Sequence, residues 1–474
     1  MTVIEIALFT TLVVYIGLLS IKKVRETTIV HYIPFLATSL MVNQMLFEIG
    51  RWQLYPIYFV TTMLTMNGLI RIYFSKTAKH QSYRLSGHRK LKILVVVALV
   101  CSGGAVYSFP VLELPEPSGP YKIGTSTFDF TDNNRMEAYD GKNTFKRKIK
   151  VQLWYPSLSV NEASKVFWLE DGVAVSRAIA KDMKTPHFLL DHTASILSNA
   201  YRDTDVLNSS EGLPVIVISH GWTGFRNIHS DLAELLASHG YIVFGIEHTY
   251  GSQVTVFKDG SVALLNPEAL PNRDATPDFL VYANKLVTTY AGDVSFILDQ
   301  LDDFNEGRYG MQFAGTIDLN RIGLLGHSTG GGADVLVALN DERIKAVLGM
   351  DAWVEPIAKE QLAIGLNIPT LFLRSEQWET GFNNEYLMKL LQNSSKVIGL
   401  YQINQSTHID FTMAYMLSRL TRWVGITGTL EREDFALVLD HFILTFFDDA
   451  VKGEPEPGPI VHPEMNAYVK KIEY

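Results

Sequence analysis

Four long apolar segments stand at the front of the chain and differ in pattern from everything that follows. Leu, Ile, Val, Phe and Met dominate them, and they cover residues 3–21, 29–49, 54–74 and 91–109. Each is about 20 residues long, enough for a helix to cross the hydrocarbon core of a bilayer. The pattern predicts an all-α membrane region of about four transmembrane helices. The second segment is the weakest, because it contains Pro34, Asn43, Gln44 and Glu48.

Basic residues are distributed unevenly among the connections between these segments. Lys22, Lys23 and Arg25 lie in the first connection, whereas the second carries only Arg51. The third carries Lys76, Lys79, Arg84, Arg89, Lys90 and Lys92. Because basic connections tend to stay in the cytoplasm, we expect a multi-pass protein of the plasma membrane. Its N-terminus and everything after residue 109 would then lie on the extracytoplasmic side of the bilayer.

A proline-rich stretch separates this region from a longer part of different pattern. Between residues 151 and 447, apolar runs alternate with helical spacing, which is typical of the α/β class with a doubly wound, mostly parallel sheet. We therefore expect a membrane region (1–111), a linker (112–120), an α/β domain (121–450) and a C-terminal extension (451–474). The chain is 47% hydrophobic, yet its net charge is −9. Its polar part is therefore acidic, which argues against nucleic acid as a partner.

Residues 326–332, Gly-His-Ser-Thr-Gly-Gly-Gly, lie where an apolar run ends and helical spacing begins. A serine at such a strand-to-helix turn is held in strained backbone geometry, and its hydroxyl points into open space. Gly326 and Gly330 keep neighbouring side chains from blocking the turn. The stretch predicts a nucleophile elbow with Ser328 as the catalytic nucleophile.

A serine nucleophile needs a histidine base, and in this fold class the chain order is serine, acid, histidine. Three histidines follow Ser328. His408 lies in a polar turn after the apolar run 397–403, where a late strand would deliver a loop to the site, so we expect it to be the base. His441 lies within a helical pattern and His462 in a proline-rich tail, so neither is well placed.

Two positions compete for the acid that orients the histidine. Asp351 ends the apolar run that follows the helix of the elbow, whereas Glu376 and Glu379 follow the next apolar run. Acids at strand ends are common, and most of them are solvated loop residues. The residues alone therefore leave both positions open.

Attack of a serine on a carbonyl group also requires hydrogen-bond donors for the negatively charged oxygen that forms. Thr329, the neighbour of Ser328, offers one backbone N–H group. The second should come from a loop after an early strand, and the run 214–219 leads into a glycine-punctuated turn that contains Trp222. We expect the backbone N–H groups of Trp222 and Thr329 to form the oxyanion hole.

Other chemistries find little support in the sequence. His187 and His192 near Asp191 lack the spacing of a metal site, and no HExxH or paired-cysteine pattern occurs. The glycines after Ser328 are not part of a phosphate-binding pattern either. We expect no metal and no cofactor.

Residues 120–450 resemble the platelet-activating-factor acetylhydrolase family of α/β-hydrolases. The resemblance rests on the elbow and on residues 218–226, 237–243, 247–248, 350–353, 375–376 and 407–411. In that family the acid directly follows the strand after the elbow, so the resemblance favours Asp351. Two features depart from the family: Thr329 stands where an aromatic residue is frequent, and a membrane region precedes the domain.

The resemblance implies a membrane-anchored serine carboxylester hydrolase that cleaves short or oxidised sn-2 acyl esters of phospholipids without calcium. Ester or phospholipid substrate and the lipid bilayer are then the expected partners. Related elbows serve many substrates, so a polyester or a small xenobiotic ester is an alternative. A catalytically silent membrane receptor or scaffold on the same fold is the alternative from another class.

The segment after His408 carries an apolar stripe at helical spacing. Residues 411–423 place Met413, Met416, Leu417 and Leu420 on one face of an expected helix. Such a stripe usually faces the core. The alternative is that it borders the substrate pocket and meets the bilayer, where it would favour lipid substrates.

Overall fold

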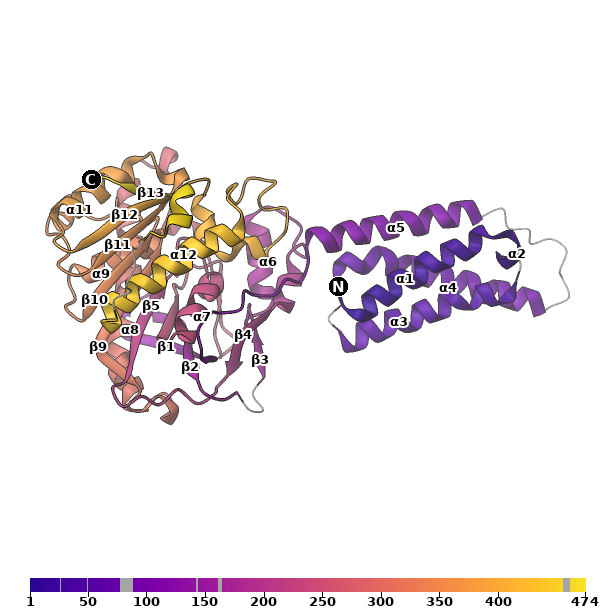
Figure 1. The fold of residues 1–474 in the computed structure, drawn as a ribbon, viewed down its shortest axis with the longest axis horizontal. Coiled ribbons are helices and arrows are strands. Elements are labelled where there is room, and N and C mark those ends of the chain that lie inside the picture. Colours follow the sequence, from indigo (N-terminus) through magenta and orange to yellow (C-terminus); the bar gives the residue numbers. More distant parts are fainter. Residues whose placement is uncertain (26, 49, 77–87, 142–143, 161–163, 455–460) are drawn as a thin grey trace.

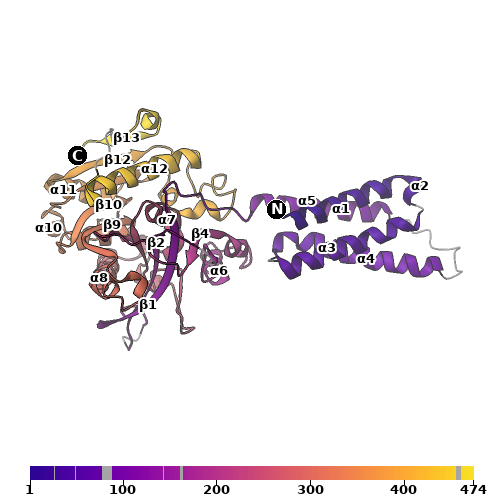
Figure 2. The same cartoon turned by 60° about the horizontal axis from the view of Figure 1, so that its bottom comes forward.

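The chain has two parts, an elongated helical bundle and a larger α/β unit (Figures 1 and 2). The computed structural model describes all residues except 26, 49, 77–87, 142–143, 161–163 and 455–460. Lys79 and Arg84, two of the basic residues of the third connection, lie outside the described residues.

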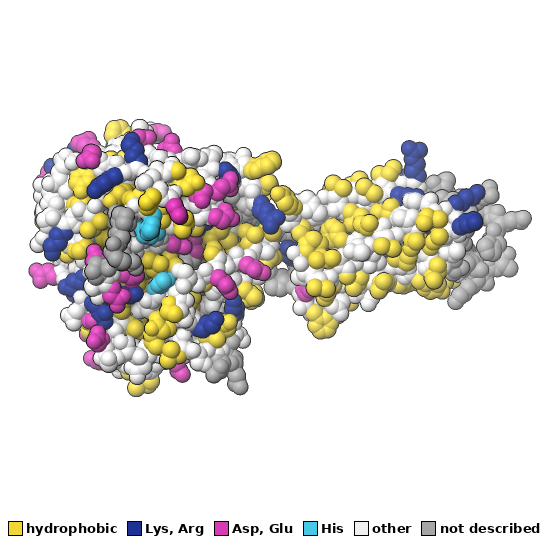
Figure 3. All heavy atoms as spheres, in the orientation of Figure 1, with side chains coloured by type: hydrophobic (Ala, Val, Ile, Leu, Met, Phe, Trp, Pro, Cys, Tyr) yellow, Lys and Arg dark blue, Asp and Glu magenta, His cyan; other side chains and the backbone are white. Residues whose placement is uncertain are grey.

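The bundle consists of the N-terminal helices, which lie side by side (Figure 1). They are α1 (Val3–Ser20), α2 (Lys22–Arg25), α3 (Ile33–Phe47), α4 (Tyr55–Lys76) and α5 (His88–Ser108). Leu8, Leu12 and Leu19 recur on one face of α1 and are buried among the other helices. The outer faces are apolar as well, with Phe47 and Phe59 exposed, and Figure 3 shows apolar side chains over the visible face of the bundle.

Three helical segments in the described part of the chain are long and apolar enough to cross a membrane. They are Val3–Ser20, Ile29–Phe47 and Arg89–Ser108. The sequence predicted about four such spans, and the missing one corresponds to α4. That helix has 22 residues, and its sequence contains three threonines, Asn67 and Arg71 among the apolar side chains.

The α/β unit is built on one sheet of eleven strands in the order β13-β12-β11-β10-β9-β5-β6-β2-β1-β4-β3. The strands are β1 (Lys122–Met136), β2 (Lys146–Ser157), β3 (Lys165–Phe167), β4 (Leu197–Arg202), β5 (Leu213–Ser219), β6 (Ile242–Glu247), β9 (Ile317–His327), β10 (Ile344–Met350), β11 (Thr370–Ser375), β12 (Val397–Ile403) and β13 (Val469–Ile472). A separate hairpin is formed by β7 (Val254–Val256) and β8 (Val262–Leu264).

In the middle of the sheet, β12, β11, β10, β9, β5 and β6 lie in this order and run parallel to one another. β13 pairs antiparallel with β12 at one side, and β2 pairs antiparallel with β6 at the other. Alternate residues of β5 enter different cores: Val215 and Val217 lie in one cluster and Ile216 and Ile218 in the other. Helices cover both faces, so the predicted doubly wound, mostly parallel α/β sheet is confirmed. They are α6 (Val173–Asp182), α7 (Ser230–Ser238), α8 (Phe279–Asn305), α9 (Thr329–Ala338), α10 (Lys359–Leu362), α11 (Phe382–Asn393) and α12 (Arg432–Phe447).

The C-terminal residues belong to the sheet. β13 pairs antiparallel with β12, and Val469 lies opposite Ile403. We expected residues 451–474 to be an extension outside the domain, but Met465 and Val469 pack into the core beneath α12. A proline-rich stretch precedes this strand in the sequence, and such a stretch does not predict that the chain pairs with the sheet again after it.

The segment after His408 does not form the expected helix. Met413–Met416 is a single 3-10 turn, and irregular turns follow it. Met413, Met416 and Leu417 are nevertheless buried, so this stripe faces the core. The exposed apolar residues of the segment are instead Trp423 (88% exposed) and Val424 (66%).

A third cluster of buried side chains connects the α/β unit with the bundle. It includes Phe225, which follows the β5 loop, and Met413, which follows His408. Phe109 and Leu112, from the end of α5 and the linker, pack against the same cluster. The indole of Trp52 also donates a hydrogen bond to the carbonyl of Leu189, at 3.1 Å. The loops that follow β5 and β12 therefore lie on the side of the α/β unit that meets the bundle.

Replacing Met416 by serine should destabilise this third cluster. Met416 is 1% exposed, so Met416→Ser would leave a cavity and bury an unpaired hydroxyl, at a cost of about 2–5 kcal/mol. Val424→Ser, on the same segment but exposed, should change stability by less than about 0.5 kcal/mol. Thermal unfolding of the full-length protein in detergent compares the two. An equal drop in melting temperature for both variants would contradict the burial of this stripe.

Candidate active site

Ser328 lies at the turn between β9 and α9 in a backbone conformation that non-glycine residues rarely adopt. Its φ is 56° and its ψ is −121°. The N–H of Ser328 donates to the carbonyl of Met350 at 3.0 Å, and its own carbonyl accepts from Trp353 and Gly332. These three hydrogen bonds hold the strained residue at the carboxyl end of the sheet.

The surroundings of Ser328 leave no room for side chains at several glycines. A Cβ atom on Gly332 would lie 2.0 Å from the carbonyl oxygen of Trp353, and one on Gly330 would lie 2.2 Å from that of Ser219. A Cβ on Gly221 would lie 2.9 Å from the Cβ of Ser328. The loop after β5 thus approaches the serine so closely that only glycine fits.

His408 and Asp351 contact each other directly. Nδ1 of His408 lies 2.9 Å from Oδ2 of Asp351, and the two side chains are 19% and 0% exposed. His408 opens a 3-10 turn after β12, and Asp351 follows β10 directly. The imidazole of His408 lies 4.4 Å from that of His327, the residue before Ser328. In the described part of the chain, Nε2 of His408 has no hydrogen-bond partner, so this edge of the ring is available to another group.

Three residues to which the sequence analysis assigned no role position this pair. Ser375 donates to both carboxylate oxygens of Asp351, from its backbone N–H at 2.8 Å and from its hydroxyl at 2.6 Å. The side-chain oxygen of Gln377 accepts the backbone N–H of His408 at 2.7 Å. Trp378 stacks on the imidazole of His408, with 4.4 Å between ring centroids and 5° between planes. Ser375 ends β11 and the other two follow it, and the family resemblance had included residues 375–376 without assigning them a role.

The competing candidates lie elsewhere. The carboxylate of Glu376 accepts a hydrogen bond from the backbone N–H of Gln405 and so supports the loop before His408. Glu379 is exposed. His441 lies in α12, where its ring is 5.0 Å from that of His462. The structure joins His408 to Asp351 and bonds Ser328 to Met350, the residue before Asp351, whereas the other candidates lie outside this arrangement.

One expected oxyanion donor follows Ser328 in the chain, and the other follows Gly221, which approaches Ser328 closely. Thr329 is the first residue of α9, and such a residue has an N–H group without a partner inside the helix. In the turn after β5, Thr223 donates its N–H to Gly251 and Gly224 donates to Gly221. The N–H of Trp222 has no hydrogen-bond partner among the described residues, so it is available to a ligand.

Buried titratable groups around the elbow are held in their neutral forms. Burial lowers the pKa of His327 well below its usual value, and the neighbouring His408 lowers it further. Its Nε2–H donates to the carbonyl of His408 at 3.1 Å. Burial raises the pKa of Asp334, beneath the turn, well above its usual value, although the hydroxyl of Ser219 donates to it at 2.7 Å. A neutral Asp334 adds no negative charge under the expected oxyanion site.

Buried ion pairs and hydrogen bonds fix the position of the loop that follows β5. Arg226 is fully buried and pairs with Asp171 at 2.7 Å and with Glu247 at 2.8 Å. His220 accepts the backbone N–H of His248 at Nε2, and burial lowers its pKa. This tautomer leaves Nδ1–H to donate to the carbonyl of Gly221 at 2.7 Å. The glycine that approaches Ser328 is therefore fixed by a network that cannot relax without leaving charges unpaired.

Among the described residues, no group of three or more His, Cys, Asp or Glu side chains is arranged to hold a metal ion. His192, one of the histidines considered above, is buried, and its ring packs against Phe109 at 5.8 Å. It therefore belongs to the contact between the two parts of the molecule.

Comparisons with known proteins agree with this architecture. Residues 106–462 match the family model of platelet-activating factor acetylhydrolase, isoform II. The platelet-activating factor acetylhydrolase of Canis lupus familiaris is 28% identical over 318 residues, 63% of this chain and 68% of that protein. A probable 1-alkyl-2-acetylglycerophosphocholine esterase of Arthroderma benhamiae is 24% identical, over 54% of this chain and 63% of that protein. A ferulic acid esterase from Streptomyces cinnamoneus shares the fold, with a TM-score of 0.61, 22% identity and coverage of 77% of this chain and 100% of that one.

The sheet order, the serine-bearing turn and these similarities define a serine ester hydrolase of the α/β-hydrolase fold. The family match covers most of the chain. The chain belongs to the platelet-activating factor acetylhydrolase, isoform II, family.

Exchanging each acid for its amide should distinguish Asp351 from Glu376. Asp351→Asn would replace the acceptor of the His408 Nδ1–H and favour the wrong tautomer, so ester hydrolysis should fall by about 10⁴-fold. Glu376→Gln is the matched control, and it should cost less than about tenfold because Glu376 contacts only backbone. Initial rates on p-nitrophenyl acetate measure both variants. The reverse order of losses would move the acid to the end of β11.

Proposed function

We propose that the chain is a membrane-anchored serine carboxylester hydrolase acting on short or oxidised sn-2 acyl esters of phospholipids. The observation that carries this proposal is the Asp351–His408 pair, in contact at 2.9 Å beside the strained Ser328. A nucleophile, a base and an orienting acid in this order are the set that acyl transfer requires.

In the first half of the reaction, Ser328 Oγ attacks the ester carbonyl while its proton moves to Nε2 of His408. The carbonyl oxygen becomes an oxyanion, which accepts hydrogen bonds from the N–H groups of Trp222 and Thr329. Asp351 holds Nδ1–H of His408 and stabilises the imidazolium that forms. The ester C–O bond then breaks, and the leaving alcohol takes the proton from Nε2.

In the second half, water resolves the acyl-enzyme. His408 Nε2 accepts a proton from the water as its oxygen attacks the acyl carbon, and the same two N–H groups bind the new oxyanion. The bond to Ser328 breaks, its oxygen recovers the proton, and the carboxylic acid leaves. Trp378, stacked on His408, limits ring rotation while the imidazole changes its partner.

The choice of a phospholipid as substrate rests on the relatives and on the position of the site. Two relatives are a platelet-activating factor acetylhydrolase and a probable 1-alkyl-2-acetylglycerophosphocholine esterase. The loops that carry Trp222 and His408 lie on the side of the α/β unit that meets the bundle. If the bundle spans a bilayer, these loops face its surface, where phospholipid esters are available.

The membrane placement is supported by the distribution of side chains over the bundle. Large apolar side chains are exposed around it, the reverse of a water-soluble helix bundle (Figure 3). Exposed basic residues lie at the end remote from the α/β unit, among them Lys22, Lys23, Arg89 and Lys90. The positive-inside tendency favours a cytoplasmic location for that end, and this supports an α/β unit on the outer side of the plasma membrane.

Removing the nucleophile tests the proposed chemistry. Ser328→Ala should reduce hydrolysis of a 2-acetyl glycerophosphocholine by on the order of 10⁴-fold or more and abolish labelling by a fluorophosphonate. Ser210→Ala is the matched control and should behave like the parent protein, because Ser210 is exposed and its side chain makes no hydrogen bond to the residues that the structure describes. Retention of most activity by Ser328→Ala, with an unchanged melting temperature, would exclude the triad. Full activity on p-nitrophenyl acetate but none on the phospholipid would reject the substrate class alone.

The topology predicts which parts of the chain are reachable from outside. A peptide tag after Tyr474 should bind antibody on intact cells or spheroplasts, and one inserted after Ser82, between α4 and α5, should bind only after permeabilisation. Flow cytometry before and after permeabilisation measures both. Reversed accessibility would place the hydrolase unit in the cytoplasm, and release by alkaline carbonate would show that the bundle does not span the membrane.

A further inference from the structure

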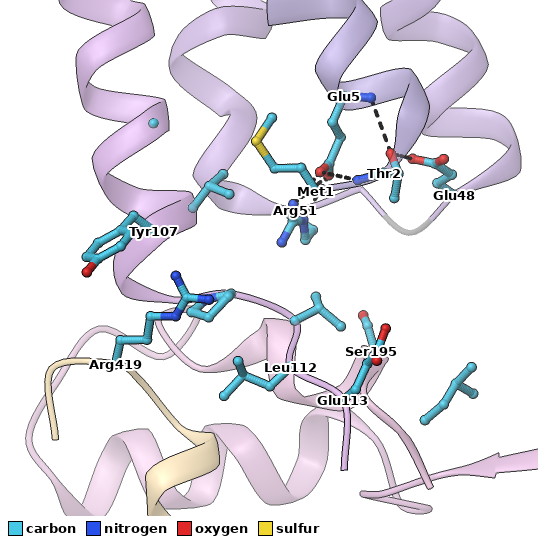
Figure 4. A pocket seen from close by; sticks show the side chains of 15 residues that line it. Met1, Thr2, Glu5, Glu48, Arg51, Tyr107, Leu112, Glu113, Ser195 and Arg419 are labelled. Atoms are coloured by element: carbon cyan, nitrogen blue, oxygen red, sulfur yellow. Dashed lines mark hydrogen bonds and ion pairs between the residues drawn. The ribbon is translucent and has the colours of Figure 1, made fainter. Parts of the chain in front are cut away.

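A cavity of about 600 Å³ lies between the bundle and the α/β unit (Figure 4). Its wall includes the end of α5, the start of α1, the linker, and Arg419 from the segment after His408. Ser328, Asp351 and His408 do not line it. Its size lies within the range of about 300–1,000 Å³ that is usual for small-molecule sites. The proposed reaction makes no use of this cavity.

Charges of opposite sign stand on different sides of the cavity. Arg419 packs over the ring of Tyr107 at 5.1 Å, and it has no carboxylate partner among the described residues. Figure 4 shows these two side chains on one side and Glu48 and Glu113 on the other. Glu113 is exposed and has no hydrogen-bond partner among the described residues. An unpaired guanidinium and an unpaired carboxylate therefore line the same space.

One further pair of charged side chains in the cavity wall is neutralised. Arg51 and Glu5 form a buried, bidentate ion pair with oxygens 2.6 Å from one guanidinium nitrogen. Glu48 accepts only the hydroxyl of Thr2, at 2.7 Å. Beyond the ion pair, the wall carries the guanidinium of Arg419 and the α-amino group of Met1 as positive groups, and the carboxylates of Glu48 and Glu113 as negative groups. Charges of both signs in one space suit a ligand that carries both a phosphate and an ammonium group.

Apolar side chains complete the wall and point to the rest of the ligand. Val106, Leu112 and Leu197 line the cavity beside its charged groups. Val106 belongs to α5. Farther from the α/β unit, this helix exposes apolar side chains. With the bundle in the bilayer, as proposed above, the cavity lies at the level of the lipid headgroups of the outer leaflet, and the apolar face of α5 lies among the acyl chains.

We propose that this cavity binds the headgroup of one zwitterionic phospholipid, of the phosphatidylcholine type. The phosphate pairs with Arg419, and the ammonium lies between Glu48 and Glu113. The acyl chains extend along α5. Such a lipid contacts both parts of the molecule, and it would hold the loops of the hydrolase unit at a fixed orientation to the membrane. This inference rests on the proposed membrane placement but not on the proposed catalytic residues.

Binding of a lipid without ester bonds tests the site independently of catalysis. We would purify the full-length protein in detergent, add a diether phosphatidylcholine, and measure the fraction that retains one lipid by native mass spectrometry. Arg419→Ala should lower that fraction about tenfold. Arg422→Ala is the matched control, because Arg422 lies three residues away, pairs with Glu431 and does not line the cavity. It should bind as the parent protein does.

Further arms identify which part of the lipid is recognised. A diether phosphatidylglycerol, which has the phosphate but no ammonium, should be retained about tenfold less. Glu113→Gln should reduce the preference for phosphatidylcholine over phosphatidylglycerol and, as an isosteric change at an exposed position, should not impair folding. Excess soluble glycerophosphocholine should compete only weakly if the acyl chains contribute, and strongly if the headgroup alone is recognised.

Two results would overturn the inference. One is equal lipid retention by the parent protein and by both cavity variants, Arg419→Ala and Glu113→Gln. The other is retention of phosphatidylglycerol as strong as that of phosphatidylcholine. If the protein left membranes in alkaline carbonate, the membrane placement itself would fail. If the parent protein did not react with a fluorophosphonate, the catalytic proposal would fail but the lipid-binding inference would not.

Discussion

The left-handed backbone of Ser328 is the constraint on which the arrangement of the site depends. A non-glycine residue at φ 56° is strained. It persists because its N–H is bonded to Met350, the last residue of β10, and its carbonyl accepts from Trp353, which follows that strand. The same contacts bring Met350, and hence Asp351, next to the serine. They also require glycine at positions 330 and 332, where any Cβ would clash with a backbone oxygen. The strained turn thus brings the end of β10 next to Ser328.

The second requirement is that the loop after β5 approach the turn without collapsing onto it. Gly221 makes the approach possible, and buried groups behind it fix its position. Arg226, Asp171 and Glu247 are buried charges that are stable only as a set. Burial lowers the pKa of His220 and of His327, so neither histidine brings a positive charge that would compete with His408. The two buried histidines therefore add no positive charge beside the Asp351–His408 pair.

The contact between the bundle and the α/β unit involves the loops that carry the candidate site. The third cluster contains side chains from the loops after β5 and β12 and from the end of α5. The hydrogen bond from Trp52 to Leu189 and that from the Ser418 hydroxyl to the carbonyl of Ser108, at 2.7 Å, reinforce it. Because the same residues support the loops and receive the bundle, the direction in which the loops face is determined by the helices. The apolar bundle and the orientation of the hydrolase unit are thus one structural feature.

The sequence by itself determined the features whose physical cause is local. The apolar helices, the alternation of strands and helices, and the strand-to-helix turn at Ser328 each arise from residues close together in the chain. The tertiary structure alone decided what depends on distant segments. It stacked Trp378 on His408 and returned β13 to the sheet edge. It also brought Asp351 rather than Glu376 against His408, a choice that the spacing of residues left open and only the family resemblance favoured. These outcomes depend on which strand ends become neighbours, and hydrophobic spacing carries no information about that choice.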